Sequence, residues 1–249
     1  MLPVIVLAAC NAPVDPSPTS RVLLKFSDGR ESLQDLAKVN EVLGTVGVHL
    51  STITLPPASV PLLESSVRTP LSDADRSKLL ELFALSRQDV LEQVRMAGRL
   101  PVLPDGGSMV TGEPDVAPYP KVYDLRSMSA QDRLSARDKF ARLHVNSTDT
   151  GTGVDEVMTL VAGGPWTWYF LLKDNVVVEL HMSRVGPSGT GWRLSYPGLT
   201  PHGGHFHAES GLCVAYITGP QVWTMRYEAP GHAGERMLGS NPWIDFNDR

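Results

Sequence analysis

Seven short strand-forming segments follow one another between residues 156 and 227, and they constrain the fold of this 249-residue chain most strongly. They are rich in β-branched and aromatic residues, and brief stretches containing Gly, Pro, Asn or Asp separate them. The segments are residues 156–162, 166–173, 176–183, 191–196, 205–209, 212–218 and 221–227. Asp174-Asn175 has the form of a two-residue hairpin turn. Short strands with brief connections predict an antiparallel sandwich or a small barrel.

The region before these strands has a mixed pattern. Residues 21–26 and 46–55 predict strands on either side of a helix at 33–43, a β-α-β pattern that would form a parallel pair with a crossover helix. Serine caps predict further helices at 73–84, 87–97 and 129–143. We therefore expect an α+β chain in three parts: an amino-terminal strand or tether (1–19), a mixed α/β region (20–145) and a β-rich, barrel-like domain (146–249).

Charge excludes two classes of partner. The net charge is −5 and no stretch concentrates Lys or Arg, whereas binding to nucleic acid or to an anionic membrane depends on clustered positive charge. The apolar stretch at residues 2–9 is also far shorter than the ~18 residues of a membrane-spanning helix. We expect a small-molecule substrate, with region 20–145 a candidate domain, lid or homodimer contact.

The amino terminus supports two interpretations. Leu7-Ala-Ala-Cys10, followed by a Pro- and Ser-rich stretch, resembles a bacterial lipobox, which implies a lipid anchor in the envelope. However, Met1 to Ala9 leaves no room for both a charged segment and an apolar segment of a secretion signal, unless translation starts upstream. The alternative is a strand at the start of a cytoplasmic protein, and this is the location we predict.

Three histidines lie within six positions, in His202-Gly-Gly-His205-Phe-His207-Ala-Glu209. Because side chains alternate along a strand, His205, His207 and Glu209 would share one face. The direction of His202 depends on where the strand begins. Imidazole is the commonest neutral metal ligand in proteins, and a carboxylate can complete the coordination.

A neighbouring predicted strand carries two more candidate ligands. In residues 176–182, Glu179 and His181 share the face opposite Val178 and Leu180. If Glu179 and His181 face a barrel lumen beside the histidines at 205 and 207, the four side chains would suit Fe(II), Mn(II), Ni(II) or Zn(II). The alternative places both on the solvent face of a strand whose other face is core.

The stretch Gly198-Leu-Thr-Pro-His-Gly-Gly-His-Phe-His207, with Glu209 and a strand ending at Gly219, resembles the first motif of the cupin superfamily, a glycine followed by His-x-His, glutamate and glycine. Pro230-Gly231-His232 loosely resembles the second motif. The match departs from the family pattern because Glu209 follows His207 too closely and the leading glycine is one position off.

The cupin resemblance implies a metal-dependent dioxygenase, lyase or isomerase acting on a small organic substrate, carboxylated or aromatic. His205, His207, His181 and His202 would hold the divalent metal, with Glu179 or Glu209 as carboxylate ligand or general base. Arg226 would bind a substrate carboxylate. Two alternatives stay open: a non-enzymatic envelope lipoprotein with a ligand- or protein-binding β domain, and an interaction protein without metal whose histidines are incidental.

Overall fold

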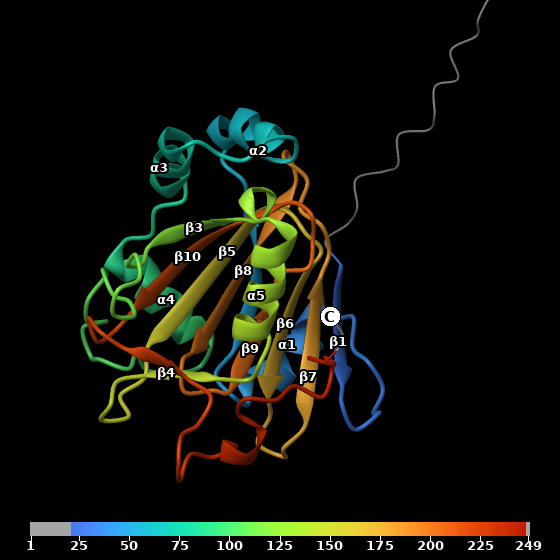
Figure 1. Cartoon of the computed structure of the whole chain (residues 1–249), viewed down its shortest axis with the longest axis vertical. Coiled ribbons are helices and arrows are strands. Elements are labelled where there is room, and N and C mark those ends of the chain that lie inside the picture. Colours follow the sequence, from blue (N-terminus) through green and yellow to red (C-terminus); the bar gives the residue numbers. More distant parts are fainter. Residues whose placement is uncertain (1–20, 248–249) are drawn as a thin grey trace, which may run out of the picture.

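Two antiparallel sheets form the body of the molecule in a computed structural model that describes residues 21–247 (Figure 1). The four-stranded sheet has the order β1-β7-β6-β9, with β1 Val22–Phe26, β7 Val177–Met182, β6 Trp166–Leu171 and β9 His202–His205. The five-stranded sheet has the order β2-β8-β5-β10-β3, with β2 His49–Thr54, β8 Thr190–Pro197, β5 Asp155–Gly163, β10 Gly211–Thr218 and β3 Lys121–Asp124. A third, two-stranded sheet pairs β4 (Val145–Ser147) with β11 (Thr224–Arg226).

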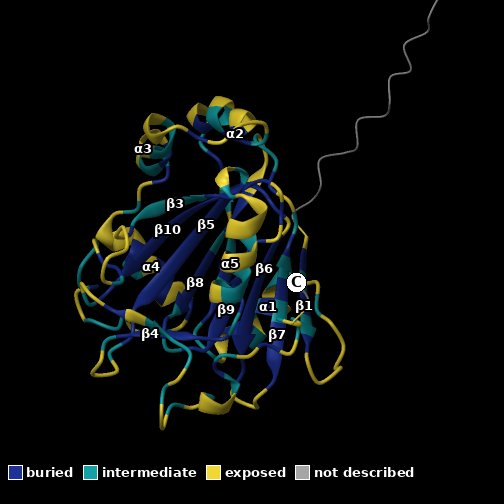
Figure 2. Ribbon diagram, in the orientation of Figure 1, coloured by how far each residue is buried: buried dark blue, intermediate teal, exposed yellow. Residues whose placement is uncertain are grey.

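The core lies between the two larger sheets, whose strands are largely buried (Figure 2). Strand alternation sends Trp168 and Phe170 of β6 into the core, and every residue of β5 is buried. Tyr196 of β8 joins the two sheets, because its ring packs against Phe170 at a centroid distance of 5.4 Å and its hydroxyl accepts a hydrogen bond of 3.4 Å from Trp168 Nε1. The β-rich antiparallel architecture is confirmed. The strands remain in separate sheets, and no closed barrel forms within residues 21–247.

The amino-terminal strands do not form the expected parallel pair. Strand β1 pairs antiparallel with β7, and β2 pairs antiparallel with β8, so α1 (Leu36–Gly44) connects the two sheets. The strand-helix-strand order is as predicted, but the parallel pairing was wrong, because the local pattern specifies two strands and a helix but not their partners. Each strand instead completes an edge formed by carboxy-terminal strands more than a hundred residues away.

The predicted helices at 73–84, 87–97 and 129–143 are present as α3 (Asp73–Leu82), α4 (Arg87–Met96) and α5 (Ala130–Phe140). Each begins at a capping box, in which a serine and an aspartate three positions later satisfy each other's backbone N–H groups. The short α2 (Val60–Ser66) and the 3₁₀ turns η1 (Pro57–Ser59), η2 (Leu125–Ser127) and η3 (Glu235–Met237) complete the helical content of the described chain.

Helix α5 lies across β9 on the outside of the four-stranded sheet (Figure 1). The close approach depends on Gly203, since a Cβ atom there would lie 2.8 Å from the carbonyl oxygen of Ala141. Strand β9 therefore has an outer side under the end of α5 and an inner side toward the core.

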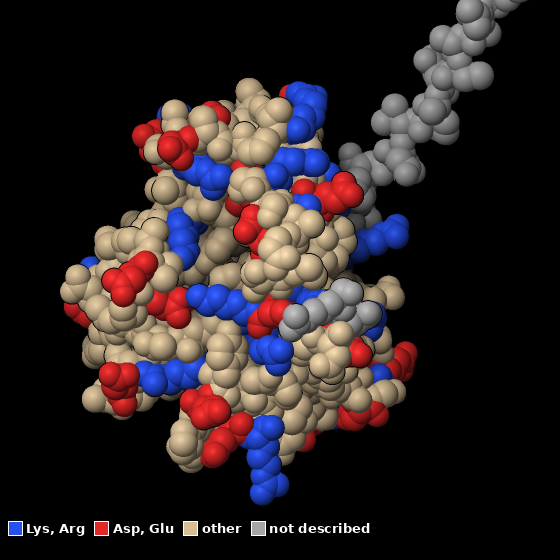
Figure 3. Space-filling model, in the orientation of Figure 1, with Lys and Arg blue, Asp and Glu red and all other residues tan. Residues whose placement is uncertain are grey.

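Lys and Arg are interspersed with Asp and Glu on the face shown in Figure 3, in keeping with the absence of a basic cluster in the sequence. Within the described residues, no helix is long and apolar enough to span a bilayer. Cys10 and the apolar stretch at residues 2–9 lie outside the described part of the chain.

Candidate functional site

Two histidines face each other inside the molecule. His144, just before β4, and His202 at the start of β9 exchange both backbone hydrogen bonds, with N–H to O distances of 2.9 and 3.0 Å. Residues paired in this way carry their side chains on the same face, and the two rings lie 4.4 Å apart between centroids. Asn146 lies two residues along β4, so its side chain points the same way.

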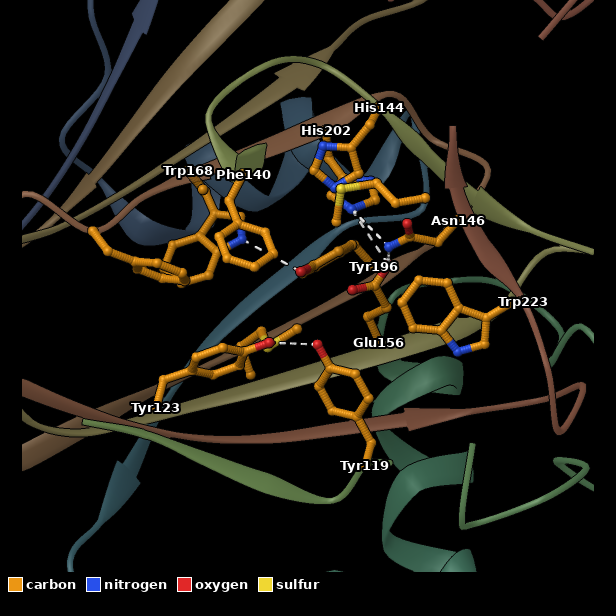
Figure 4. A pocket seen from close by; sticks show the side chains of 14 residues that line it. Tyr119, Tyr123, Phe140, His144, Asn146, Glu156, Trp168, Tyr196, His202 and Trp223 are labelled. Carbon is orange, nitrogen blue, oxygen red and sulfur yellow. Dashed lines mark hydrogen bonds and ion pairs between the residues drawn. The ribbon is translucent and has the colours of Figure 1, made fainter. Parts of the chain in front are cut away.

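Glu156 of β5 completes this cluster of four side chains, hereafter the interior cluster (Figure 4). Its Oε1 accepts a hydrogen bond of 2.8 Å from Asn146 Nδ2 and lies 3.3 Å from His202 Nε2. Tyr196, directly opposite Glu156 on β8, donates a further hydrogen bond to the carboxyl group. The polar groups thus meet at the point where β4, β5, β8 and β9 converge.

Backbone carbonyls fix the orientation of both imidazoles. His144 Nδ1 lies 2.7 Å from the oxygen of Arg142, and His202 Nδ1 lies 2.7 Å from the oxygen of Thr200. A carbonyl can only accept, so each Nδ1 donates its proton and each neutral ring keeps a lone pair on Nε2. This is the arrangement that orients metal-binding histidines in proteins.

Burial shifts the protonation of the interior cluster. It lowers the pKa of His202 to about 4 and holds the pKa of His144 well below its usual value, with the neighbouring His202 adding to the effect. Burial also raises the pKa of Glu156 to about 7, against the opposing effect of hydrogen bonds from Asn146 and Tyr196. The 3.3 Å contact between His202 and Glu156 therefore joins a neutral imidazole to a carboxyl group that titrates near neutral pH, and it is not a salt bridge.

The interior cluster forms one end of a cavity of about 40 Å³. This volume can hold an ion or one or two water molecules. No Lys or Arg lines the cavity, whose remaining wall is aromatic and thioether. The apolar wall consists of Tyr119, Tyr123, Phe140, Met158, Trp168, Phe206, Trp223 and Met225, together with the glycine at 204.

The donor atoms of the interior cluster suit a divalent transition metal. Two imidazole nitrogens, one carboxylate and one amide oxygen are ligands that Fe(II), Mn(II), Ni(II) and Zn(II) accept. The amide oxygen of Asn146 is buried without a hydrogen-bond partner, and its Nδ2 lies between Glu156 Oε1 (2.8 Å) and His202 Nε2 (3.5 Å). As they stand, no three His, Cys, Asp or Glu side chains in residues 21–247 are arranged to hold an ion. A half-turn of the Asn146 amide would place its oxygen between Glu156 Oε1 and His202 Nε2 and complete the donor set.

The histidines singled out in the sequence form a second group, hereafter the outer cluster: Glu179 and His181 of β7, His205 of β9, and His207. Thr167 of β6 lies opposite both His181 and His205, so these residues form one row across three strands. The row lies on the outside of the four-stranded sheet. Of the two placements considered for Glu179 and His181, the structure shows the one that faces away from the core, because the alternate residues of β7 carry larger apolar surface and pack in the core.

Three other predicted site residues lie elsewhere. His202 points to the opposite side of β9 from His205, because the strand begins at His202 and the two residues are three positions apart. Glu209 is exposed in the bend after β9. Arg226 lies on β11, where its guanidinium donates hydrogen bonds to Ser147 Oγ (3.2 Å) and Asp149 Oδ1 (2.5 Å). The structure therefore brings Glu179, His181, His205 and His207 together but separates the remaining three from them.

Sequence reasoning missed His144, Asn146, Glu156 and Tyr196. A signal was present: His144-Val-Asn146 has the His-x-His form with Asn in the second position, and Glu156 stands seven positions before Gly163. Pro197-Gly198 then precedes His202.

Comparison with known proteins adds a likeness of fold. No protein-family model matches the chain, and no curated protein matches its sequence. Among solved structures, the chain resembles acireductone dioxygenase from Bacillus anthracis, a cupin-fold enzyme solved with a cadmium ion in its active center. The TM-score is 0.53 at 16% sequence identity, over 80% of this chain and 94% of that chain. This likeness supports the cupin-like fold expected from the sequence, and it concerns the fold alone.

Proposed function

We propose that the chain is a metal-dependent, cupin-like enzyme acting on a small organic substrate, and that the interior cluster is its metal site. One observation carries the proposal: two neutral imidazoles, each oriented by a backbone carbonyl, meet a buried carboxyl group and an unpartnered amide oxygen in one cavity. The fold likeness to an enzyme solved with cadmium in its active center supports this assignment.

In this proposal His144 Nε2, His202 Nε2, Glu156 and the Asn146 amide oxygen would hold the ion. When bound, a divalent metal would polarise substrate oxygens, or activate O₂ if it is iron. Without the ion, burial raises the pKa of Glu156 to about 7, and a bound dication would favour the ionised carboxylate that ligates it. The hydroxyl of Tyr196 keeps that carboxyl group in place.

The side chains that line the cavity indicate which kind of substrate the enzyme would accept. Its aromatic and thioether side chains favour an apolar or aromatic molecule beside the ion, but a cavity of about 40 Å³ has no room for one, so the wall would have to open to admit a substrate. Arg226, which we expected to bind a substrate carboxylate, does not line this cavity. Dioxygenase, lyase and isomerase reactions all remain within the proposal, because each can use a metal held by this donor set.

Elemental analysis of untagged protein, dialysed without chelator, tests the assignment. We expect about one equivalent of Fe, Mn, Ni or Zn in the wild type, loss of that metal in Glu156→Gln, and retention in a His205→Ala/His207→Ala variant. Circular dichroism establishes that each variant is folded. Retention in Glu156→Gln with loss in the double variant would move the metal to the outer cluster. A wild-type protein that neither retains nor rebinds metal would overturn the proposed function.

The alternative of an envelope lipoprotein depends on Cys10, outside the described residues, and no observation on the described chain favours it. An upstream reading frame that supplies a charged segment before Leu2 would support it.

A further inference from the structure

The outer cluster gathers metal-ligating groups on a face that the interior cavity does not use. Its side chains come from β7, from β9 and from the segment that follows β9, and a hollow of about 390 Å³ lies over them. Helix α5 borders this hollow at Arg137, and the carboxy-terminal segment borders it at Trp243 and Asp245. The hollow lies outside the core, on the side of β9 opposite His202.

The strand register places two of the three imidazoles, those of His181 and His205, in one row across three strands. His181 and His205 both pair with Thr167, so their Cα atoms lie two strand spacings apart, roughly 10 Å. Two histidine side chains directed at a common ion can span this distance. His207 lies beside His205, with 4.7 Å between ring centroids, and is exposed.

Glu179 places a carboxylate in the same group. Its Oε2 lies 2.8 Å from His181 Nε2 and 3.2 Å from Lys25 Nζ, and its charge also acts on His205. Lys25 and Arg137 contribute positive charge at the edges of the cluster, and Glu179 and Asp245 contribute negative charge. The formal charges balance, so they do not exclude a dication.

We infer that the outer cluster is a second, accessory site for a divalent transition-metal ion of the Zn²⁺ type, held by His181, His205 and His207 with Glu179 as the carboxylate ligand. Imidazole nitrogen selects Zn²⁺, Ni²⁺ or Cu²⁺ over Mg²⁺ and Ca²⁺, which prefer oxygen ligands. The side chains are not yet arranged around one point. Rotation of the exposed His207 ring toward His205 and His181 would close the site.

A bound ion would tie β9 to β7 across β6. Strand β9 has only four residues, and its pairing with β6 is its contact within the four-stranded sheet. The ion would therefore stabilise the strand that also presents His202 to the interior cavity. The inference does not depend on the proposed enzymatic function, because it concerns residues on the other side of the sheet.

Isothermal titration calorimetry with Zn²⁺ tests this site on the full chain in its purified state. We expect one saturable equivalent in the wild type and in Glu156→Gln, and at least a tenfold weaker affinity in His205→Ala/His207→Ala. His49→Ala and His232→Ala serve as matched controls, because each removes a partly exposed imidazole outside the outer cluster. Titration with Mg²⁺ should give no binding at this site.

Visible absorption of added Co²⁺ gives a second readout, since an ordered nitrogen and oxygen ligand set changes its spectrum and a random surface association does not. Unchanged Zn²⁺ affinity in the folded double variant would overturn the outer site. So would an equal loss of affinity in the His49→Ala or His232→Ala control. Loss of binding in Glu156→Gln alone would assign the titrated ion to the interior cluster instead.

Discussion

Replacement of Glu156 by Gln should change how the stability of the metal-free protein depends on pH. Burial in the folded state raises the pKa of this carboxyl group from 4.5 to about 7. Between these two values the folded state holds a proton that the unfolded state has released. The resulting stabilisation is fully present below pH 4.5 and is lost as the pH rises through 7. Gln cannot titrate, so the variant lacks this pH dependence.

The size of the effect follows from the shift. One pKa unit corresponds to about 1.4 kcal/mol, so the full difference amounts to roughly 3 kcal/mol. About 2.5 kcal/mol of this stabilisation is lost between pH 5 and pH 8, a range in which equilibrium unfolding can be measured. His144 and His202 have lowered pKa values and act in the opposite direction, with stability lost as the pH falls. Both are present in wild type and variant, so their effect largely cancels in the difference.

Urea unfolding of the two proteins at several pH values, in the presence of a chelator, measures this difference. We expect the free energy of unfolding of wild type relative to Glu156→Gln to fall by about 2.5 kcal/mol from pH 5 to pH 8. Glu209→Gln is the matched control for the removal of a carboxyl group, because Glu209 is exposed. A flat difference for Glu156→Gln would refute the conclusion that its carboxyl group is buried and protonated near neutral pH.

Three further changes test the packing around the site by denaturant unfolding. Gly203→Ala should destabilise the protein by roughly 1–3 kcal/mol, because the new methyl group meets α5, whereas Gly186→Ala, in open space, should be close to neutral. Arg99→Met should cost roughly 3–5 kcal/mol, since it leaves Asp155 charged and buried, and a second change of Asp155→Leu should recover part of the loss. Ser129→Ala should cost about 1 kcal/mol through loss of the cap of α5, and an unchanged midpoint would contradict that role.

The sequence predicted most of the carboxy-terminal strands because each carries its own local signal, but in place of the strand predicted at 205–209 the structure has β9 at His202–His205. Period-two alternation in residues 176–183 and the Asp174-Asn175 turn require no knowledge of the rest of the chain, and β7 follows a turn with Asn175 at φ 63°. Strand partners are not local properties, so the antiparallel placement of β1 and β2 was beyond this reasoning.

The same limit explains the interior cluster. His144 follows a predicted helix and has no alternating pattern around it, so its direction is set only by pairing with His202. Glu156 stands in a strand buried on both faces, where alternation does not distinguish inside from outside. The rings of His205 and His207 lie side by side although β9 ends at His205, so the parity that grouped both with Glu209 does not explain their proximity.

The pairing of β1 with β7 has a consequence for the order of events during synthesis. Lys25 and Glu179, which face each other across these strands, are 154 positions apart. At 5–20 residues per second, a ribosome needs roughly 10–30 seconds to make the intervening chain. During that time β1 and β2 have left the ribosome while the edges that they complete do not yet exist. The nascent chain therefore exposes two unpaired strands during that interval, and unpaired strand edges favour aggregation.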